Sequence, residues 1–411
     1  MSAYPAQQIL PLPAGIRFIP AVTFVAAFEN MSAPPALLAI AGGFETTLAQ
    51  AAWTVTAYAL AYGLAQLVWG TLAVRFGKRT ILRAGLGAAA ACDLVSMFAP
   101  SLEALIASRA MAGACVGAVI PCVIGLVGDV VPLERRQRSM TDLITGHAAG
   151  TALGTLCGGA AADLISWHAV FGVGAALTAA GAVLGSRLPE GQRDRTARLL
   201  AVARRLPTVL CRRWSLIVIL FGMLEGAVLF ALVHFLSPAL IVAGMPAKWA
   251  GAIVAAYGVS VLIWSRIANR LAIRLRILAM MTIGFGLMVA GHIAAAIDIG
   301  PFGILSAAIL LSGATAFVHS SLQVWSTEAV PELRGLVVPV FACFLFSGNA
   351  AVIQIIAQAK TVADFAAVYA WGAVAAVVSG LVMLIARRAY EAETQNSRLE
   401  RGSGHIVGRK N

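Results

Sequence analysis

The stretch that decides the fold covers residues 53–85 and reads WTVTAYALAYGLAQLVWGTLAVRFGKRTILRAG. It opens with a mostly apolar run of about twenty residues, the length that an α-helix needs to cross a hydrocarbon core of about 30 Å. A short basic break follows at 75–79, and a second apolar run begins directly after it. The pattern predicts two membrane-spanning helices joined by a short loop.

The same alternation of apolar runs and short polar breaks continues through all 411 residues. We therefore expect an all-α polytopic membrane protein with twelve transmembrane helices. Gly and Pro inside such helices are tolerated, because neighbouring helices satisfy the freed backbone groups. The expected helices are approximately 17–40, 51–73, 80–98, 103–127, 139–162, 167–187, 214–238, 248–266, 276–297, 302–326, 336–357 and 364–387.

The composition excludes an ordinary soluble protein. Hydrophobic residues make up 60% of the chain and charged residues 12%, whereas about a quarter of the residues of a soluble domain are charged. The net charge of +12 would indicate nucleic-acid binding in a soluble domain. We expect no nucleic acid here, because the basic residues lie in alternate breaks. The six cysteines form no CxxC motif and five lie in apolar runs, so they are expected to be packing residues.

The distribution of basic residues also predicts the orientation, since cytoplasmic loops carry an excess of Lys and Arg. All 30 Lys and Arg residues except Arg109, Lys248 and Lys360 fall near the N-terminus, in or beside the even-to-odd breaks (2–3, 4–5, 6–7, 8–9 and 10–11), or in the tail. This places both termini in the cytoplasm and the protein in the inner (plasma) membrane. No basic segment precedes the first apolar run, so we expect that helix to be retained.

The longest break, 189–213, lies between six predicted helices and six more. We expect an N-terminal six-helix bundle over 1–188, a basic cytoplasmic linker over 189–213, a C-terminal six-helix bundle over 214–388 and a polar cytoplasmic tail over 389–411. The linker is expected to be either a helix on the membrane surface or a solvated segment. We expect the tail to be disordered.

The two halves match weakly at a nearly constant offset. Asp129 and Glu328 are 199 residues apart, Arg75 and Arg270 are 195 apart, and Glu29 and Glu225 are 196 apart. These pairs lie on helices or breaks that already correspond by number. A parallel six-helix repeat places the substrate site between the halves, near the middle of the membrane.

The segment 53–85 resembles helix 2 and the following loop of the major facilitator superfamily. Val74 stands where the family motif has an acidic residue, as does Asn269 in the second half. In the family this loop is thought to hold the cytoplasmic face shut, so the resemblance implies a gating role, with Asp129 pairing with Arg75 or Arg79. The residues that fit the motif are Gly70, Leu72, Ala73, Arg75, Gly77, Lys78 and Arg79, with Arg270 as the counterpart of Arg75.

Two further segments resemble motifs of the same family. SRAMAGACVGA (108–118) is similar to the helix 4 motif, with Arg109 and Gly113 in place. GHAAGTALGTLCGG (146–159) is similar to the helix 5 motif of antiporters, chiefly drug and metabolite exporters, with Thr155 in place of its Pro. The matching glycines are Gly150, Gly154, Gly158 and Gly159. Glycines at 146, 150, 154 and 158 also form one face, expected to pack closely on another helix and to act as a seam between the halves.

Two acidic residues are expected near the middle of the membrane, Glu29 in the first helix and Glu225 in the seventh. A charged group there costs on the order of 3 kcal/mol, so such residues usually serve transport. Burial disfavours the charged form of a carboxyl group, which can then exchange protons with either side. The alternative is a protonated Glu that only bonds neighbouring helices. The resemblance implies that helices 1 and 7 both line the central cavity, so we expect both acids to face one volume.

Arg109 in the fourth helix cannot readily lose its charge and needs an anionic or carbonyl partner. Glu29 is one candidate partner and an anionic substrate group is another. The alternative is that its side chain reaches the membrane interface. Asp93, near the end of the third helix, is expected to reach the periplasmic interface.

Other polar residues in the helices are weaker candidates for proton transfer or substrate binding. Each of them could equally be a hydrogen-bonded packing residue. They are His147, His234, His319, Tyr58, Gln66, Asn349 and Gln354.

The sequence therefore predicts a monomeric secondary transporter that works by alternating access. Our leading hypothesis is proton-coupled export of a small amphipathic organic compound or drug. The alternative is import or facilitated passage of a small metabolite or anion. We expect no enzyme, because the sequence contains no metal cluster, nucleotide-binding loop or nucleophile–base arrangement, and we expect no cofactor. The expected partners are a small-molecule substrate, protons and membrane lipid.

Overall fold

The computed structural model describes residues 13–196 and 199–407, and every regular element in them is helical. The short 3-10 turns η1 (Ala14–Phe18) and η2 (Pro34–Ala36) flank the first helix. The N-terminal helices are α1 (Ile19–Ser32), α2 (Leu37–Gly43), α3 (Leu48–Ala51), α4 (Trp53–Phe76), α5 (Lys78–Met97), α6 (Leu102–Val116), α7 (Val119–Val130), α8 (Leu133–Leu164) and α9 (Trp167–Gly185).

The second half begins after α10 (Leu199–Cys211), the helix of the linker. Two π-helical turns, η3 (Gly226–Phe230) and η4 (Thr315–His319), interrupt its helices. The remaining elements are α11 (Arg213–Glu225), α12 (Ala231–His234), α13 (Leu236–Val242), α14 (Ala247–Ala272), α15 (Ile277–Ile297), α16 (Pro301–Ala314), α17 (Ser320–Ala329), η5 (Pro331–Leu333), α18 (Arg334–Ile356) and α19 (Val362–Val407).

Eleven helices or runs of consecutive helices in the described residues are long and apolar enough to cross a membrane. α8 is not among them, because its first turns are charged and its remainder is rich in Gly and Thr. It is nevertheless 32 residues long, and it packs inside the bundle, against α1 and α14. The all-helical membrane fold is confirmed, and the twelve expected spans are consistent with it.

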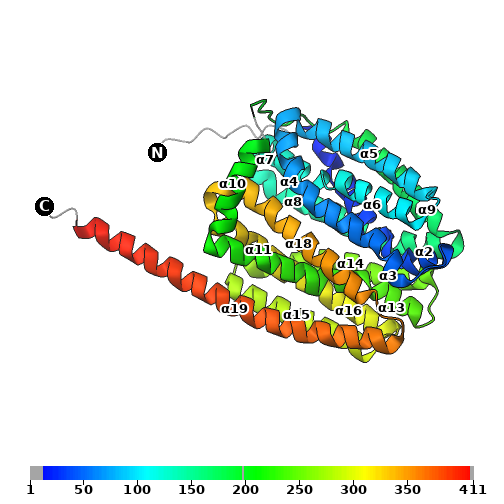
Figure 1. The fold of residues 1–411 in the computed structure, drawn as a ribbon. Helices are drawn as coiled ribbons and strands as arrows, with labels where there is room; N and C mark the ends of the chain where they lie inside the picture. The colour runs from blue at the N-terminus through cyan, green and yellow to red at the C-terminus, as the bar shows by residue number, and fades with distance from the viewer. Residues whose placement is uncertain (1–12, 197–198, 408–411) are drawn as a thin grey trace.

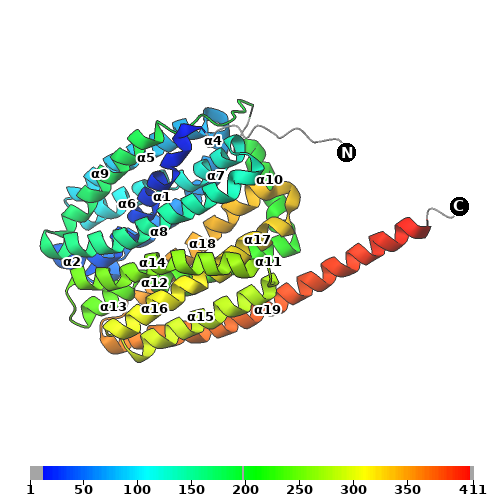
Figure 2. The same ribbon diagram turned by 180° about the vertical axis from the view of Figure 1, so that it is seen from behind.

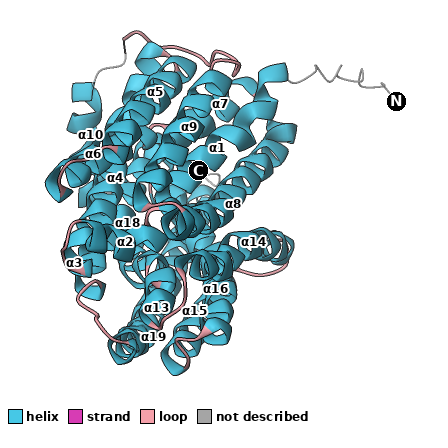
Figure 3. Cartoon of the chain, turned by 90° about the vertical axis from the view of Figure 1, so that its right-hand side faces the viewer, coloured by secondary structure: helices cyan, strands magenta, loops and turns pink. Residues whose placement is uncertain are grey.

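The helices form two groups that meet along two pairs of helices. α4 packs against α18, and α8 packs against α14. Figure 3 shows the two groups, with α5, α7 and α9 on one side and α15, α16 and α19 on the other. The linker helix α10 lies at one end of the molecule (Figures 1 and 2), which we call the linker end.

The opposite end is closed by contacts between the two groups. There, α13 contacts both η2 and α2. Ile40 and Leu240, from the two sides of this contact, are fully buried. The first described residues lie at the linker end instead, because Gly15 lies against the carbonyl group of Arg187, just after α9.

The loop of the opening segment is a single residue. Gly77 joins α4 to α5 with a φ of 97°, in the left-handed region that a residue with a Cβ rarely adopts. This glycine allows the chain to reverse at once, so the basic residues on both sides of it meet at the linker end.

The glycine face of α8 packs within the first bundle. A methyl group at Gly146, Gly150 or Gly158 would lie 2.1 Å from a carbonyl oxygen of α1, and one at Gly154 would lie 2.8 Å from another. These four glycines therefore let α1 and α8 approach closely, which agrees with the predicted close packing. They do not form the predicted seam between the halves, because both helices belong to the first bundle. Gly159 points elsewhere. It meets Ala247 and Gly251 of α14, so it lies in the contact between the bundles.

The linker and the tail both contain helix. The linker contains a helix, α10, which agrees with the helical one of the two alternatives. This helix also packs against α4, α11 and α18, with Val209 buried among them. The tail was expected to be disordered, but α19 continues to Val407 and extends past the bundle at the linker end (Figure 1). Helix-favouring residues and pairs such as Arg387 with Glu391 explain the continuation. Residues 408–411 lie outside the described residues.

Candidate functional site

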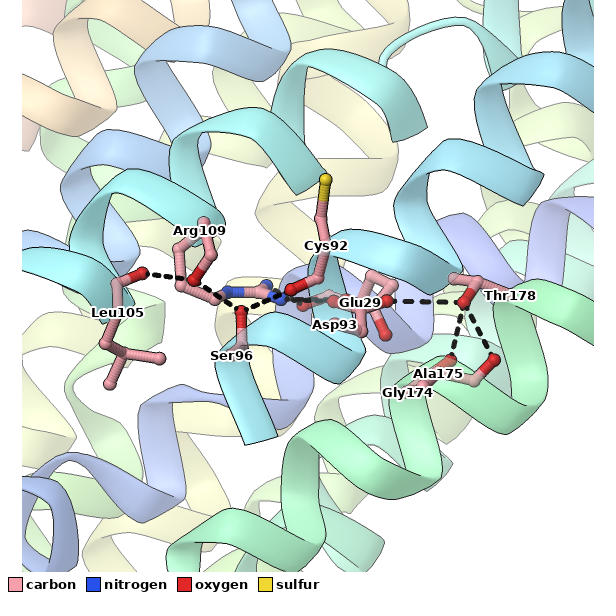
Figure 4. A network of polar contacts seen from close by, with 10 residues as sticks. Glu29, Cys92, Asp93, Ser96, Leu105, Arg109, Gly174, Ala175 and Thr178 are labelled. Atoms are coloured by element: carbon pink, nitrogen blue, oxygen red, sulfur yellow. Dashed lines mark hydrogen bonds and ion pairs between the residues drawn. The ribbon is translucent and has the colours of Figure 1, made fainter. Parts of the chain in front are cut away.

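Three charged side chains meet inside the first bundle. Glu29 comes from α1, Asp93 from α5 and Arg109 from α6. Nη1 of Arg109 lies 3.1 Å from Oε2 of Glu29 and 2.8 Å from Oδ1 of Asp93. All three side chains are at most 1% exposed. Figure 4 shows them converging, and we call them the N-bundle cluster.

Aromatic and hydroxyl groups surround the N-bundle cluster. The Arg109 guanidinium lies 4.6 Å from the ring centre of Tyr58 and 5.1 Å from that of Phe171, which are cation–π distances. The Thr178 hydroxyl lies 3.2 Å from Oδ2 of Asp93 (Figure 4). Oε1 of Glu29, Nε of Arg109 and the Tyr58 hydroxyl are buried and make no hydrogen bond with described residues. The cluster thus has free hydrogen-bonding capacity.

The charges of the N-bundle cluster do not balance when both acids are ionised. One guanidinium faces two carboxylates, which gives a net charge of −1. A net charge buried away from water costs several kcal/mol. A single proton on either acid makes the cluster neutral. This arrangement can therefore take up and release one proton.

The structure settles three expectations about this region. Glu29 is the partner of Arg109, as one of the two candidate pairings predicted. Arg109 does not reach the interface, because it is 1% exposed. The expectation for Asp93 was wrong, since it is fully buried and bonded to Arg109. A signal for its burial does exist: Asp93 lies on the same side of α5 as the buried residues Leu86 and Ala89.

A second buried acid lies in the second bundle. Glu225 ends α11, and its Oε2 lies 3.2 Å from Nδ1 of His319, the last residue of η4. The Glu225 side chain is 0% exposed and that of His319 is 27% exposed. Nε2 of His319 lies 3.0 Å from the amide nitrogen of Gln323, which is exposed. We call Glu225, His319 and Gln323 the C-bundle cluster.

Glu29 and Glu225 were expected to face one common volume, but they do not. Glu29 bonds Arg109 within the first bundle, whereas Glu225 bonds His319 within the second bundle. The reason lies in helix rotation. Glu29 points toward α9, where a methyl group at Gly174 would lie 2.4 Å from its Oε1. Depth along a helix was predictable from the sequence, but the side of the helix was not.

The other candidate residues are distributed over both bundles. Nδ1 of His234 bonds the carbonyl oxygen of Phe230 in its own helix run. The Asn349 side chain is fully buried, and neither of its amide atoms has a partner among the described residues. The Gln354 amide lies 2.8 Å from the Thr56 hydroxyl, which joins α18 to α4. Gln66 is buried on α4.

The predicted gating loop forms ion pairs, but with other partners than expected. Asp129 pairs with Lys78, at 2.6 Å between Nζ and Oδ2, rather than with Arg75 or Arg79. Arg79 pairs with Glu190 of the linker. Arg75 packs its guanidinium 5.3 Å from the ring centre of Phe76. No ion pair is seen for Arg270 in the described part of the chain. Lys78 was available because it follows Gly77 and turns back toward α7.

The linker supplies several of these partners. The backbone N–H of Gln192 donates to Oδ2 of Asp129 at 2.7 Å, and the N–H of Asp194 donates to the carbonyl oxygen of Val74 at 2.9 Å. Val74 occupies the place of the acid in the family motif. Acidic residues that follow α9, Glu190 above all, thus provide negative charge at this end of the bundle.

The comparison with known families decides the identity of the fold. The model of the Major Facilitator Superfamily matches residues 21–353, more than three quarters of the chain. The chain belongs to the major facilitator superfamily.

Several curated proteins are similar to part of the chain. The multidrug efflux pump LfrA of Mycolicibacterium smegmatis is 29% identical over 193 residues, 47% of this chain and 36% of that protein. The methylenomycin A resistance protein of Streptomyces coelicolor is 28% identical over 183 residues, 44% and 38% of the two chains. The puromycin resistance protein pur8 of Streptomyces alboniger is 31% identical over 176 residues, 42% and 34%. The matches thus span little more than a third of each relative.

Solved transporter structures share the fold. A peptide transporter POT in complex with sulfate has a TM-score of 0.73 at 17% identity, covering 92% of this chain and 95% of that chain. A POT family transporter in complex with 5-aminolevulinic acid has a TM-score of 0.75 at 11% identity, covering 91% and 96%. At these identities the likeness concerns the fold, and it extends over nearly the whole described molecule.

Proposed function

We propose that this chain exports small amphipathic organic compounds in exchange for protons, by alternating access. The observation that carries the proposal is the buried N-bundle cluster, in which two carboxyl groups bond to one guanidinium. It is supported by the relatives, which are named as a multidrug efflux pump and as antibiotic resistance proteins. A transporter that couples export to protons needs a buried group that changes charge within each cycle.

The path from proton to movement runs along the first helix run. Glu29 lies on α1, which continues through η2 into α2, and these two elements contact α13 and thereby close the end opposite the linker. Proton binding removes the charge of one carboxyl group and weakens one of the two bonds to Arg109. The resulting change in the position of α1 bears directly on that closure.

We place the substrate between the bundles, where it enters from the linker end in the state described. His319 and Gln323 are accessible there, while Ile40 and Leu240 close the opposite end. By the distribution of basic residues the linker end is cytoplasmic. The moving units are the bundles 1–188 and 214–388, joined by the linker, in a monomer in the plasma membrane. The Lys78–Asp129 pair and the linker contacts hold the first bundle together at the cytoplasmic face.

The alternative, import of an anion that binds Arg109, has less support. Arg109 already contacts two carboxyl groups and is almost completely buried, so it has no accessible face for an anionic substrate. Binding of such a substrate would require both acids to leave or to become protonated.

The first test is to find a ligand and then to measure its export. A substrate raises the thermal stability of the purified protein in proportion to its occupancy, so a panel of lipophilic cations and antibiotics is screened by melting temperature. The ligand found is then added to the outside of everted membrane vesicles, and its accumulation inside is measured. Accumulation driven by a proton gradient supports the proposal. Downhill uptake that survives Glu29→Gln, with no response to a proton gradient, overturns it.

A further inference from the structure

Glu225 is a buried acid with no route of its own to water. Its side chain is 0% exposed, and the contact of its carboxylate among the described residues is with His319. Its other oxygen, Oε1, is buried without a hydrogen-bond partner. Any proton that reaches Glu225 in this state must therefore pass through a neighbouring group.

His319 has the geometry of that neighbouring group. Its Nδ1 faces Glu225 at 3.2 Å, while its Nε2 faces Gln323 at 3.0 Å, on the side that is exposed. The amide nitrogen of Gln323 can only donate, so it holds Nε2 as the acceptor and leaves the ring proton on Nδ1, directed at the carboxylate. The two ring nitrogens thus connect an accessible position to a buried one.

The ring is fixed in this position by packing. The ring centres of Phe230 and Phe341 lie 5.7 Å and 6.0 Å from that of His319. Two further titratable groups face the pair from neighbouring helices. His147 of α8 interacts electrostatically with His319, and Tyr257 of α14 with Glu225, the Tyr257 hydroxyl bonding Thr315 of η4. Neither group intervenes between His319 and Glu225.

We propose that His319 transfers protons between water at the linker end and Glu225, which makes Glu225 a second protonation site, separate from the N-bundle cluster. The Gln323 amide first turns to offer its oxygen, which frees the lone pair of Nε2. A hydronium ion then gives a proton to Nε2 and leaves as water, while the Nδ1–H bond breaks and its proton forms an O–H bond at Oε2 of Glu225. The imidazole stays neutral, now with its proton on Nε2, and the net change is one proton moved from the solvent to the carboxylate.

The position of the two residues connects this transfer to the backbone. Glu225 directly precedes the π-helical turn η3, and His319 is the last residue of η4. Turns of this kind carry one extra residue and are frequent at functional sites. Transfer replaces a hydrogen bond from the neutral imidazole to a charged carboxylate by one between neutral groups, so it alters the force between two helix runs that can shift at these turns. Each bundle then contains its own protonation site.

The role of this transfer in transport rests on the proposed function, but the transfer itself is measured without a substrate. Purified full-length protein is subjected to a rapid drop in pH, and the infrared band of protonated carboxyl groups is followed in time. Glu225→Gln identifies the part of the band that belongs to Glu225. We expect His319→Gln to slow that part by at least about tenfold, since a positioned proton-transfer group typically contributes 10²–10⁴.

Two further variants keep the test decisive. His292→Gln is the matched control, because His292 is also a buried histidine of the second bundle but bonds the backbone of Met288 and no carboxyl group. It should leave the Glu225 band unchanged. Gln323→Leu keeps the ring and removes its outer partner. It should slow the band by a smaller factor, and it replaces His319→Gln as the test if that variant does not fold.

An unchanged rate of the Glu225 band in the folded variants overturns the transfer role of His319. The result is separable from the proposed function. Slowing of the band without any export in vesicles leaves the transfer standing and refutes the function. Proton-driven export together with an unchanged rate of the Glu225 band supports the proposed function and refutes the transfer by His319.

Discussion

Arg109 decides the chemistry of the first bundle, because a guanidinium keeps its charge in a site that water does not reach. The two acids beside it, Glu29 and Asp93, are buried with a single positive charge between them. Unlike an acid on the surface, one of them needs a proton to make the site neutral. The cluster is neutral with one proton and charged with none or two. Uptake or loss of a single proton therefore switches the cluster between a neutral and a charged state.

Replacing Arg109 by methionine should destabilise the protein strongly. Removing one partner of a buried ion pair leaves uncompensated charge and typically costs about 3–5 kcal/mol. The melting temperature of purified Arg109→Met protein, compared with wild type, measures this loss. Arg213→Met is the control, because Arg213 is an exposed residue whose partner Glu393 lies 3.8 Å away. Adding Asp93→Asn to Arg109→Met should recover part of the loss, and equal melting temperatures of all variants would refute the cluster.

The partners of Arg109 follow from the sequence to different degrees. The Glu29–Arg109 pairing was predictable, because both are charged residues on neighbouring spans that each need a partner. The burial of Asp93 could have been inferred as well, because it lies on the same side of α5 as Leu86 and Ala89. Its pairing with Arg109 could not, because the sequence does not say which helix faces that side of α5.

At the scale of elements, the contact between α1 and α8 is the closest in the first bundle. It depends on the absence of side chains at every fourth residue of α8, which lets carbonyl groups of α1 approach. α1 carries Glu29, and α8 contacts α14 on its other face. Under the proposed function, a displacement at Glu29 would therefore pass from α1 through α8 to α14.

Gly150→Ala should weaken this contact. The new methyl group would lie 2.1 Å from the carbonyl oxygen of Phe24, so the helices must separate, at a cost of about 1–3 kcal/mol. Gly87→Ala on α5 is the matched control, since nothing lies within 4 Å of that position, and helix propensity alone favours it by up to about 1 kcal/mol. Melting temperatures of the two variants should move in opposite directions. A neutral Gly150→Ala would contradict the close contact.

The linker is held to the first bundle at Asp129, which bonds both Lys78 and the backbone of Gln192. Asp129→Asn should therefore release the segment that contains Arg193 and Arg195. Limited digestion with trypsin should cleave there several times faster than in wild type, since cleavage follows the population of the open form. Asp163→Asn, which removes a surface pair with Lys248 at the opposite end, should leave the digestion rate unchanged. Equal rates for both variants would mean that Asp129 does not hold the linker.

Helix positions were predictable to within a few residues from the length of each apolar run, because membrane thickness sets that length. The π-helical turns were not predictable. They lie where Gly226 packs against α18 and where Phe317 packs against α15, and no period in the hydrophobic pattern reports one extra residue. The continuation of α19 was not predictable from apolar runs, because its last turns are polar; helical ion pairs such as Arg387 with Glu391 support it instead.

At the scale of the whole molecule, the two bundles are closed at one end and more accessible at the other. Leu240 lies in the closed end, and Gln323 lies on the accessible side. A thiol reagent that does not cross membranes should label Gln323→Cys and not Leu240→Cys in purified protein without ligand. Native Cys211 is exposed and is replaced by Ser in both variants. Equal labelling of the two positions would contradict the asymmetry.

Export of a substrate in exchange for protons requires that ligand binding releases protons. A ligand found by thermal screening is added to purified protein in weakly buffered detergent solution, and the protons released are counted with a pH-sensitive dye. We expect the wild type to release protons on ligand binding. Glu29→Gln should abolish the part that comes from the N-bundle cluster while retaining ligand binding. Ligand binding without proton release by the wild type, or undiminished release by Glu29→Gln, would refute proton exchange at this cluster.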